Sequence, residues 1–408
     1  MSERRVLAVC SARVLLFATF MTVAATISLI TTEWGLSAAA AGAIISSFTV
    51  GYAASLFGFA MIADRLGAKR MVVISAIVAS FASLAFGLLA RDWTSAMVLY
   101  GLVGLSQGGL YTPLIMVFSD EIEPARLGTA MGRLISSTSV GYATSLGAAG
   151  IGAAIGGWQG AFLLTGALPA VGAIVLIWSL RPVPNRIHSR PRDARLFDEL
   201  FRERDTRLLF TGYVAHSWEL LGMWAWMPTF LAAAFVFNGM QTVGASASGA
   251  YVTGGLHLFG AIAALTMGRL SDRVGRRPTL IVLAAAGAVL SFVVGWLVHA
   301  PLVLLVPLAL VYAFVCIGDS PVLTTAISEV VRAGFRGAVL AWRALAGVAA
   351  GAIAPLAVGA VIDGVGLVTD SLTVVWGLGF ATLGLGGAIA LASALMLRRH
   401  RKEPPRTP

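Results

Sequence analysis

Long apolar stretches separated by short polar ones follow one another along all 408 residues of the chain. Most of these stretches approach or exceed the ~20 residues that an α-helix needs to cross a bilayer. They are uniformly apolar and do not alternate with a period of two, which argues against the strands of a membrane barrel. Because backbone groups in lipid must be satisfied internally, the pattern predicts a helical bundle. We expect twelve spans, numbered in chain order, near residues 7–30, 37–62, 70–90, 94–119, 127–155, 158–180, 208–235, 247–270, 278–299, 301–328, 337–363 and 373–397.

Composition agrees with this pattern. Hydrophobic residues make up 58% of the chain and charged residues only 12%, whereas about a quarter of a soluble domain is charged. The two cysteines, Cys10 and Cys316, lie far apart in apolar runs and predict neither a disulfide framework nor a metal site. The first apolar stretch follows Arg4 and Arg5 like a signal peptide, but so many spans follow that we expect an uncleaved first helix.

One connection is longer and more polar than the others. Residues 181–207 contain three prolines and a dense mixture of both charges, which is typical of a solvated linker. We therefore expect a six-helix half at residues 1–181, a linker at 182–207, a second six-helix half at 208–398 and a basic tail at 399–408.

The distribution of the 29 lysines and arginines predicts the orientation. We count 25 of them at the termini, in the linker and in the loops on the same face, and only Arg91 on the other face. Because cytoplasmic loops carry an excess of basic residues, both termini are expected in the cytoplasm of a bacterial cell, with the spans in its cytoplasmic membrane. The net charge of +10 thus reports topology and does not indicate a nucleic-acid partner.

The two halves repeat with an offset of 208 residues. The loop that contains Asp64 after the second span resembles the loop that contains Asp272 after the eighth. At the same offset Pro113 corresponds to Pro321, and Glu121 to Glu329. Many transporters build their substrate site between internal repeats of this kind.

These loops resemble the motif G-x-L-x-D-R-x-G-R-[KR] of the major facilitator superfamily. The second copy, Gly268 to Arg277, matches in full, whereas the first departs at Ala60 and Ala68. The resemblance covers essentially the whole chain, and the text of span seven is similar to the members near the cyanate and nitrate permeases. It implies an all-α membrane protein, with twelve transmembrane helices in two pseudo-symmetric halves, that works by alternating access.

The resemblance also implies a cytoplasmic gate built from the loop motif. Asp64 and Asp272 would cap neighbouring helix N-termini, where a carboxylate is favoured. Arg65 and Arg273 would pair with Glu121 and Glu329. The alternative is that these charges only fix topology. The residues assigned to the gate are Asp64, Arg65, Gly67, Lys69, Arg70, Asp272, Arg273, Gly275, Arg277, Glu121, Glu329, Arg133 and Arg343.

Span seven carries the most informative charges inside the membrane. Glu219 lies about 18 Å along this helix from its start, near the midplane, and His216 shares its face. Since an ionisable group at this depth is costly, the face should point into the bundle. The pair then predicts a proton-titrating carboxylate tuned by histidine, or a direct substrate ligand. The alternative is a His216–Glu219 hydrogen bond that only fixes packing.

Other polar residues within the spans extend this candidate pathway. Asp319 in span ten precedes Pro321, and its repeat partner is Tyr111; either protonation or a buried salt bridge accounts for it. Arg13 either snorkels to the headgroups or points to a substrate carboxylate. The substrate and proton pathway is expected to contain Glu219, His216, Asp319, Tyr111, Gln107, His257, Arg13 and Trp218, although packing also explains His257 and Trp218.

Arg133 and Arg343 lie at matching depths in spans five and eleven. They would either flank an anionic substrate or pair with the gate carboxylates Asp272 and Asp64.

The expected activity is proton-coupled uptake of a small, anionic solute. No nucleotide-binding motif appears, so the energy must come from a gradient. We expect the solute, protons and the bilayer as partners, with no cofactor, metal, nucleic acid or obligate protein partner, and no enzymatic activity. The alternatives are a multidrug or metabolite exporter, a membrane-embedded enzyme and a non-transporting receptor. The absence of a proline between Gly141 and Gly157 in span five disfavours drug–proton antiport.

Overall fold

The computed structural model describes residues 1–187, 203–331 and 336–398, and within its helices it leaves out a few side chains, Asp64 among them. The described chain is helical throughout and contains no strand. The first half contains α1 (Glu3–Leu16), α2 (Thr22–Trp34), α3 (Ala38–Leu66), α4 (Ala68–Leu89), α5 (Trp93–Gln107), the 3-10 turn η1 (Gly108–Leu110), α6 (Thr112–Glu121) and α7 (Pro124–Leu180). The second contains α9 (Arg204–Phe237), α10 (Thr242–Val274), α11 (Arg276–Val294), η2 (Gly295–Leu297), α12 (Leu302–Val330), α13 (Arg336–Gly366) and α14 (Leu372–Met396).

These helices form the twelve expected crossings. Within the described residues, ten helices are long and apolar enough to span a membrane. One of them, α7, crosses twice because it reverses at Gly156 and Gly157, where the φ of +62° at Gly157 suits only glycine. Helices α1 and α2 together form the first span. Helix α9 begins at Arg204, within the range expected for the linker.

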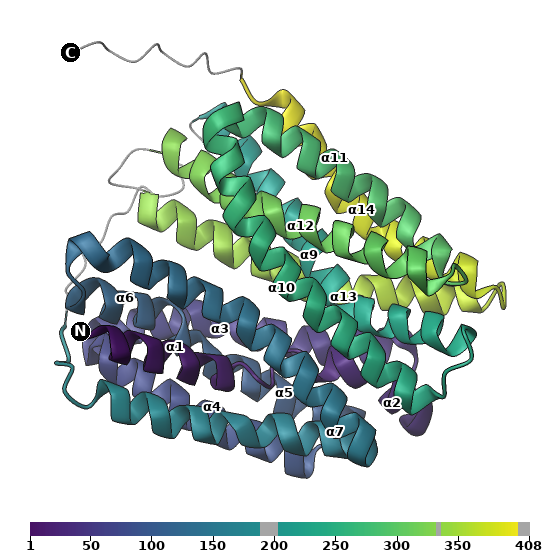
Figure 1. Cartoon of the computed structure of the whole chain (residues 1–408), viewed down its shortest axis with the longest axis horizontal. Helices are drawn as coiled ribbons and strands as arrows, with labels where there is room; N and C mark the ends of the chain where they lie inside the picture. The colour runs from purple at the N-terminus through teal and green to yellow at the C-terminus, as the bar shows by residue number, and fades with distance from the viewer. Residues whose placement is uncertain (188–202, 332–335, 399–408) are drawn as a thin grey trace.

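The polypeptide packs as two bundles. One apolar core draws nearly all its residues from positions 6–183 and a second from positions 209–394. Figure 1 shows the first bundle, in purple and blue, lying beside the second, in green and yellow. Across the boundary, α3 packs against α13 and α7 against α10. Two glycines let the backbones of α3 and α13 touch: Gly42 faces the carbonyl of Pro355, and Gly359 faces that of Ala38.

The two bundles are joined at the end of the molecule that lies away from Met1. There the Asp363 carboxylate accepts hydrogen bonds from the amides of Ala38 and Ala39, both at 2.7 Å, and so caps the first turn of α3. Nearby, the hydroxyls of Ser28 and Ser246 are 3.2 Å apart. At the end that holds Met1, the Met1 ammonium donates to the carbonyl of Glu121, and Arg276 pairs with Glu329, each contact lying within one half.

Two spans of the first half are broken, whereas their repeat counterparts are continuous. Span one stops being helical between Leu16 and Thr22, and span four passes through η1 to Tyr111. In the second half, α9 and α12 run without interruption, even though Pro321 of α12 corresponds to Pro113 at the start of α6. The breaks leave backbone carbonyls that need other partners.

Candidate functional site

Glu219 points from α9 into the interior of the second bundle. Its side chain is only 4% exposed, and its Oε1 accepts a hydrogen bond from Ser291 Oγ of α11 at 2.7 Å. The thiol of Cys316 on α12 donates to the same oxygen at 3.5 Å, and Tyr312 contacts Ser291 at 2.5 Å. The missing side chain of Gly287 leaves room for the carboxylate, because a Cβ there would lie 3.1 Å from Oε1.

His216 lies one turn before Glu219 and binds a different acid. Its Nδ1 is 2.9 Å from Oδ1 of Asp319 on α12, and its Nε2 is 2.8 Å from Ser320 Oγ. The His216 ring thus faces a carboxyl group through Nδ1 and a hydroxyl through Nε2. The structure therefore joins His216 to Asp319, whereas the packing alternative had joined it to Glu219.

The two acidic groups belong to one buried layer between α9 and α12. Cys316 and Asp319 are three residues apart on α12, as His216 and Glu219 are on α9, so each pair shares a helix face. A carboxylate buried in such a layer can take up a proton and so become neutral. No described lysine or arginine pairs with Glu219.

Arg13 and Gln107 each donate a hydrogen bond to a carbonyl that the break in the other span leaves free. Gln107 Nε2 donates to the carbonyl of Leu16, where α1 ends, at 2.9 Å. Arg13 Nε donates to the carbonyl of Leu110, at the end of η1, at 3.1 Å. Each span thus supplies a side chain that satisfies the carbonyl freed in the other, which the sequence did not reveal.

The Arg13 guanidinium, on a side chain only 1% exposed, has further neutral partners. Its Nη1 donates to Leu134 O at 2.7 Å and to the hydroxyls of Ser137 and Thr138 at 3.0 and 2.7 Å. Its centre lies 5.7 Å from the ring of Tyr111, which is 37% exposed. Arg13 therefore points inward and does not snorkel.

Arg343 and Arg133 have unlike surroundings despite their matching positions. Arg343 is 7% exposed, its guanidinium lies 3.9 Å from the ring centre of Tyr213, and its Nη1 donates to Thr324 Oγ1 at 3.0 Å. Its Nε is buried without a hydrogen-bond partner. Arg133, in contrast, is partly exposed and pairs with Glu3 at 2.9 Å, a surface pair worth about 0–1 kcal/mol.

His257 and Trp218, both expected in the pathway, do not lie at one site. His257 is buried at the boundary of the halves, with ring centres 4.7 Å from Trp224 and 5.5 Å from Tyr142 of the first half. Its Nε2 has no hydrogen-bond partner. Trp218 faces α14 instead, where its Nε1 donates to Thr382 O at 3.0 Å. The pathway residues are therefore not all brought together, and Trp218 stands apart.

The loop motif holds each bundle together at the end near Met1. Gly67 and Gly275 have φ angles of +88° and +109°, which explains why the motif needs glycine there. Lys69 Nζ donates to the carbonyls of Arg181 and Val183 just after α7, at 3.2 and 2.5 Å. Its repeat equivalent, Arg277, donates to Leu395 O near the end of α14 at 2.8 Å.

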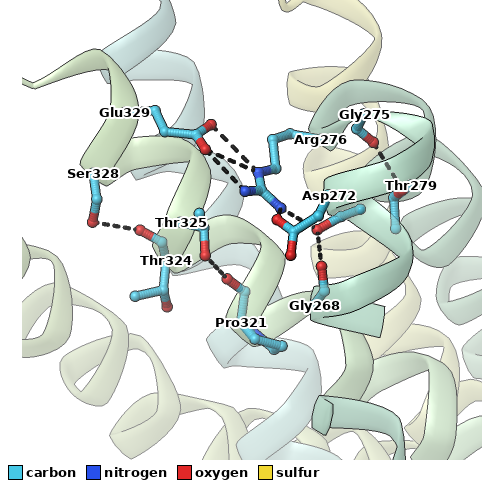
Figure 2. Close-up of polar contacts among 11 residues, drawn as sticks. Gly268, Asp272, Gly275, Arg276, Thr279, Pro321, Thr324, Thr325, Ser328 and Glu329 are labelled. Atoms are coloured by element: carbon cyan, nitrogen blue, oxygen red, sulfur yellow. Dashed lines mark hydrogen bonds and ion pairs between the residues drawn. The ribbon is translucent and has the colours of Figure 1, made fainter. Parts of the chain in front are cut away.

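Three acidic residues at this end, Asp272, Glu329 and Glu121, form ion pairs with described arginines. Figure 2 shows the Arg276 guanidinium between Glu329 and Asp272, at 2.9 Å from Glu329 Oε1 and 2.6 Å from Asp272 Oδ1. The expected partner of Glu329 was Arg273, one turn earlier. In the first half, Glu121 pairs with Arg186 at 3.0 Å.

Arg65 and Arg70 are exposed, and the Arg70 amide donates to Asn185 Oδ1 at 3.1 Å. Asp64 lies outside the described side chains, so its expected pairing stays a prediction.

Several residues that complete this arrangement were not predicted. Asp363 had a weak sequence signal, as an isolated acid near the end of span eleven on a face that carries little charge. Ser291, Tyr312 and Ser246 gave no signal, since hydroxyls are common in apolar spans and only the fold reveals their partners.

Two ranges of this chain, residues 9–257 and 239–408, match the sequence model of the Major Facilitator Superfamily. The chain belongs to this superfamily. Inner membrane transport protein YnfM of Escherichia coli K12 is 25% identical over 287 residues, which is 68% of this chain and 66% of YnfM. A probable sulfoacetate transporter, SauU of Cupriavidus necator, is 26% identical over 203 residues, or 50% of this chain and 46% of SauU.

Solved structures show the same facilitator fold. A bacterial homologue of the human lysosomal transporter Spinster, in an inward-facing and unoccupied conformation, has a TM-score of 0.77 at 17% identity and covers 97% of this chain and 96% of its own. YnfM, SauU and the Spinster homologue are all described as transport proteins or their homologues. Neither sequence relative given above is a cyanate or nitrate permease, so the narrower resemblance stays a prediction.

Proposed function

We propose that this chain is a secondary transporter that couples the uptake of a small anionic solute to protons. It works in the bacterial cytoplasmic membrane with both termini in the cytoplasm. The observation that carries the proposal is Glu219, a carboxylate buried within a membrane-spanning helix and held only by Ser291 and Cys316.

A buried carboxylate of this kind is suited to carrying a proton. An ionised acid at the centre of a bilayer costs about 2.5–3.5 kcal/mol. The groups that face Glu219 are Ser291 of α11, Tyr312 and Cys316 of α12, and, one turn away, the His216–Asp319 pair. None of them is a fixed cation, so protonation is the available way to neutralise Glu219.

The buried arginines support an anionic solute. Arg13 and Arg343 have no acidic partner among the described side chains, and a buried unpaired charge is costly. A solute anion would supply the missing negative charge. One relative, SauU, is a probable sulfoacetate transporter, and sulfoacetate is a small anion.

The test is uptake into proteoliposomes that contain the purified protein, with and without an imposed pH gradient. The solutes are small carboxylates, nitrate and cyanate, and the variant is Glu219→Gln. We expect the wild type to accumulate an anion when the outside is acidic. Glu219→Gln should lose this accumulation but retain counterflow, because exchange of solute for solute needs no net proton movement.

The matched control is Glu33→Gln. Glu33 accepts a hydrogen bond from Trp158 at the end away from Met1, at 2.7 Å, and lies outside the acidic layer. It should keep gradient-driven accumulation. Accumulation by Glu219→Gln equal to that of the wild type would contradict the proposed coupling, and failure of the wild type to move any of these anions would favour the exporter alternative.

A further inference from the structure

Arg343 has hydrogen-bonding capacity that the protein does not use. Its side chain is 93% buried, yet its Nε has no partner, and among the described residues only the neutral Thr324 accepts from it. A guanidinium presents its donors as a planar fork that matches a carboxylate. Because burying such a group without an anion is costly, the arrangement points to a ligand that supplies one.

Tyrosines gather around the two buried arginines. The chain has seven tyrosines, and four of them belong to this cluster: Tyr52, Tyr111, Tyr142 and Tyr213. The Arg13 guanidinium lies 5.7 Å from the ring centre of Tyr111 of the first half, and Tyr111 is near enough to Arg343 for their charges to interact. Tyr142, also of the first half, packs its ring against Trp224 of the second half at 5.3 Å. The cluster therefore combines a cation of the second half with aromatic faces of the first.

The exposure of these rings shows where a ligand would lie. The Tyr213 ring is covered by the Arg343 guanidinium at 3.9 Å. Tyr111 keeps 37% of its surface exposed although it lies in the middle of span four, and Tyr52 is only partly buried. Flat aromatic faces beside a cation favour a planar π-system over a flexible chain.

The charges indicate a ligand with one negative group. Arg13 already donates to two carbonyls and two hydroxyls, so it contributes a positive field but few free donors. Arg343 alone offers an unpartnered Nε. One available fork fits one carboxylate better than a dianion.

We propose that Arg343 binds the carboxylate of a planar aromatic monocarboxylic acid, whose ring packs against Tyr111 and Tyr52. This inference rests on the proposed function and names its solute class. The acid contacts α13 through Arg343 and α3 and span four through the tyrosines, so it lies between the two halves.

The test is binding to the purified full-length protein in detergent, measured by isothermal titration calorimetry with three probes. Benzoate has both the ring and the charge, cyclohexanecarboxylate has the charge without aromaticity, and benzamide has the ring without the charge. We expect benzoate to bind at least about tenfold more tightly than benzamide, since a hydrogen bond to a charged group is worth that factor. It should bind about three- to tenfold more tightly than cyclohexanecarboxylate, as aromatic pairing predicts.

Two variants locate the site. Arg343→Lys keeps the charge but loses the planar fork, and should weaken benzoate at least about tenfold. Tyr111→Leu should remove the preference for benzoate over cyclohexanecarboxylate while leaving the latter unchanged. Arg133→Lys is the matched control, because Arg133 lies at the matching depth of span five and pairs with Glu3 near the surface, and it should bind benzoate like the wild type.

Some outcomes overturn this inference and leave the proposed function intact. Equal binding of benzoate and cyclohexanecarboxylate, or unchanged binding by Arg343→Lys, would refute the aromatic site even if a pH gradient drives aliphatic anions into liposomes. Conversely, benzoate binding that depends on Arg343, without any effect of the pH gradient on its uptake, would support the site and refute proton coupling.

Discussion

Arg13 and Arg343 are both buried arginines, but they differ in how fully the protein satisfies them. Arg13 is bonded to carbonyls released by broken helices, so it holds the backbone as well as contributing charge. Arg343 is bonded to one hydroxyl and stacked on one ring. The contrast predicts a mainly structural role for the first and a ligand-binding role for the second.

Replacing Arg13 should therefore lower the stability of the folded protein, in keeping with a mainly structural role. Arg13→Met leaves the carbonyls of Leu110 and Leu134 without their donors, and we expect it to cost roughly 3 kcal/mol of unfolding free energy. Arg133→Met, which removes only a surface pair, should cost about 0–1 kcal/mol. Unfolding of the purified proteins in mixed micelles measures both. A more stable Arg13→Met protein would show instead that the desolvation of the guanidinium outweighs its hydrogen bonds.

At this scale the sequence identified most buried charges but not their partners. Hydropathy alone marks Glu219, His216 and Asp319 as costly residues within spans. Whether His216 binds Glu219 or Asp319 depends on how α12 rotates against α9, and that rotation is set by packing rather than by the residues' spacing. For the same reason the sequence did not indicate that Ser291 and Tyr312 lie beside Glu219.

At the scale of helices, close crossings depend on glycines whose missing Cβ atoms allow backbone contact. Gly104 of α5 faces the carbonyl of Phe48 on α3 with no room for a side chain. Gly147 of α7 has nothing within 4 Å of where its Cβ would lie. The two positions therefore predict opposite outcomes for the same substitution.

Gly104→Ala should force α5 away from α3 and lower the yield and melting temperature of the folded protein. Gly147→Ala should leave folding intact and stabilise its helix by about 0.5–1 kcal/mol, because alanine loses less conformational freedom than glycine. Size-exclusion profiles and thermal melts in detergent compare the two. Normal folding of Gly104→Ala would mean that the α3–α5 contact is looser than the structure shows.

The number and approximate ends of the spans were predictable because bilayer thickness fixes helix length. The breaks in spans one and four were not, since Phe17 to Met21 read as continuous apolar helix and Pro113 has a counterpart, Pro321, inside an unbroken helix. What breaks span four is the local combination of Gly108, Gly109 and the side chains that satisfy the freed carbonyls.

For the whole molecule, hydrogen bonds from Asp363 to Ala38 and Ala39 and between Ser28 and Ser246 join the two halves at the end away from Met1. Alternating access requires these contacts to separate during the cycle. The hydroxyl oxygens of Ser28 and Ser246 lie 3.2 Å apart on opposite sides of this boundary, so cysteines at these positions should be able to form a disulfide. They provide a direct way to hold this end closed.

The double variant Ser28→Cys/Ser246→Cys should form a disulfide under mild oxidation and lose transport, and a reductant should restore it. The native Cys10 and Cys316 are buried and unpaired, so they should not compete. Each single variant, treated with the same oxidant, serves as the control. Undiminished transport by the fully cross-linked protein would mean that this end does not open.

The reversal inside α7 joins spans five and six through a very short turn. Gly156 and Gly157 make the turn, and a Cβ at Gly152 would lie 2.5 Å from the carbonyl of Gly160, so the two spans are in direct backbone contact beside it. Span five packs against α10 of the other half, and the two helices of this hairpin also pack against α1 and α4 of their own half. Because the two spans touch through their backbones beside the turn, neither can slide along the other without losing this contact, and we expect spans five and six to move together when the halves rearrange.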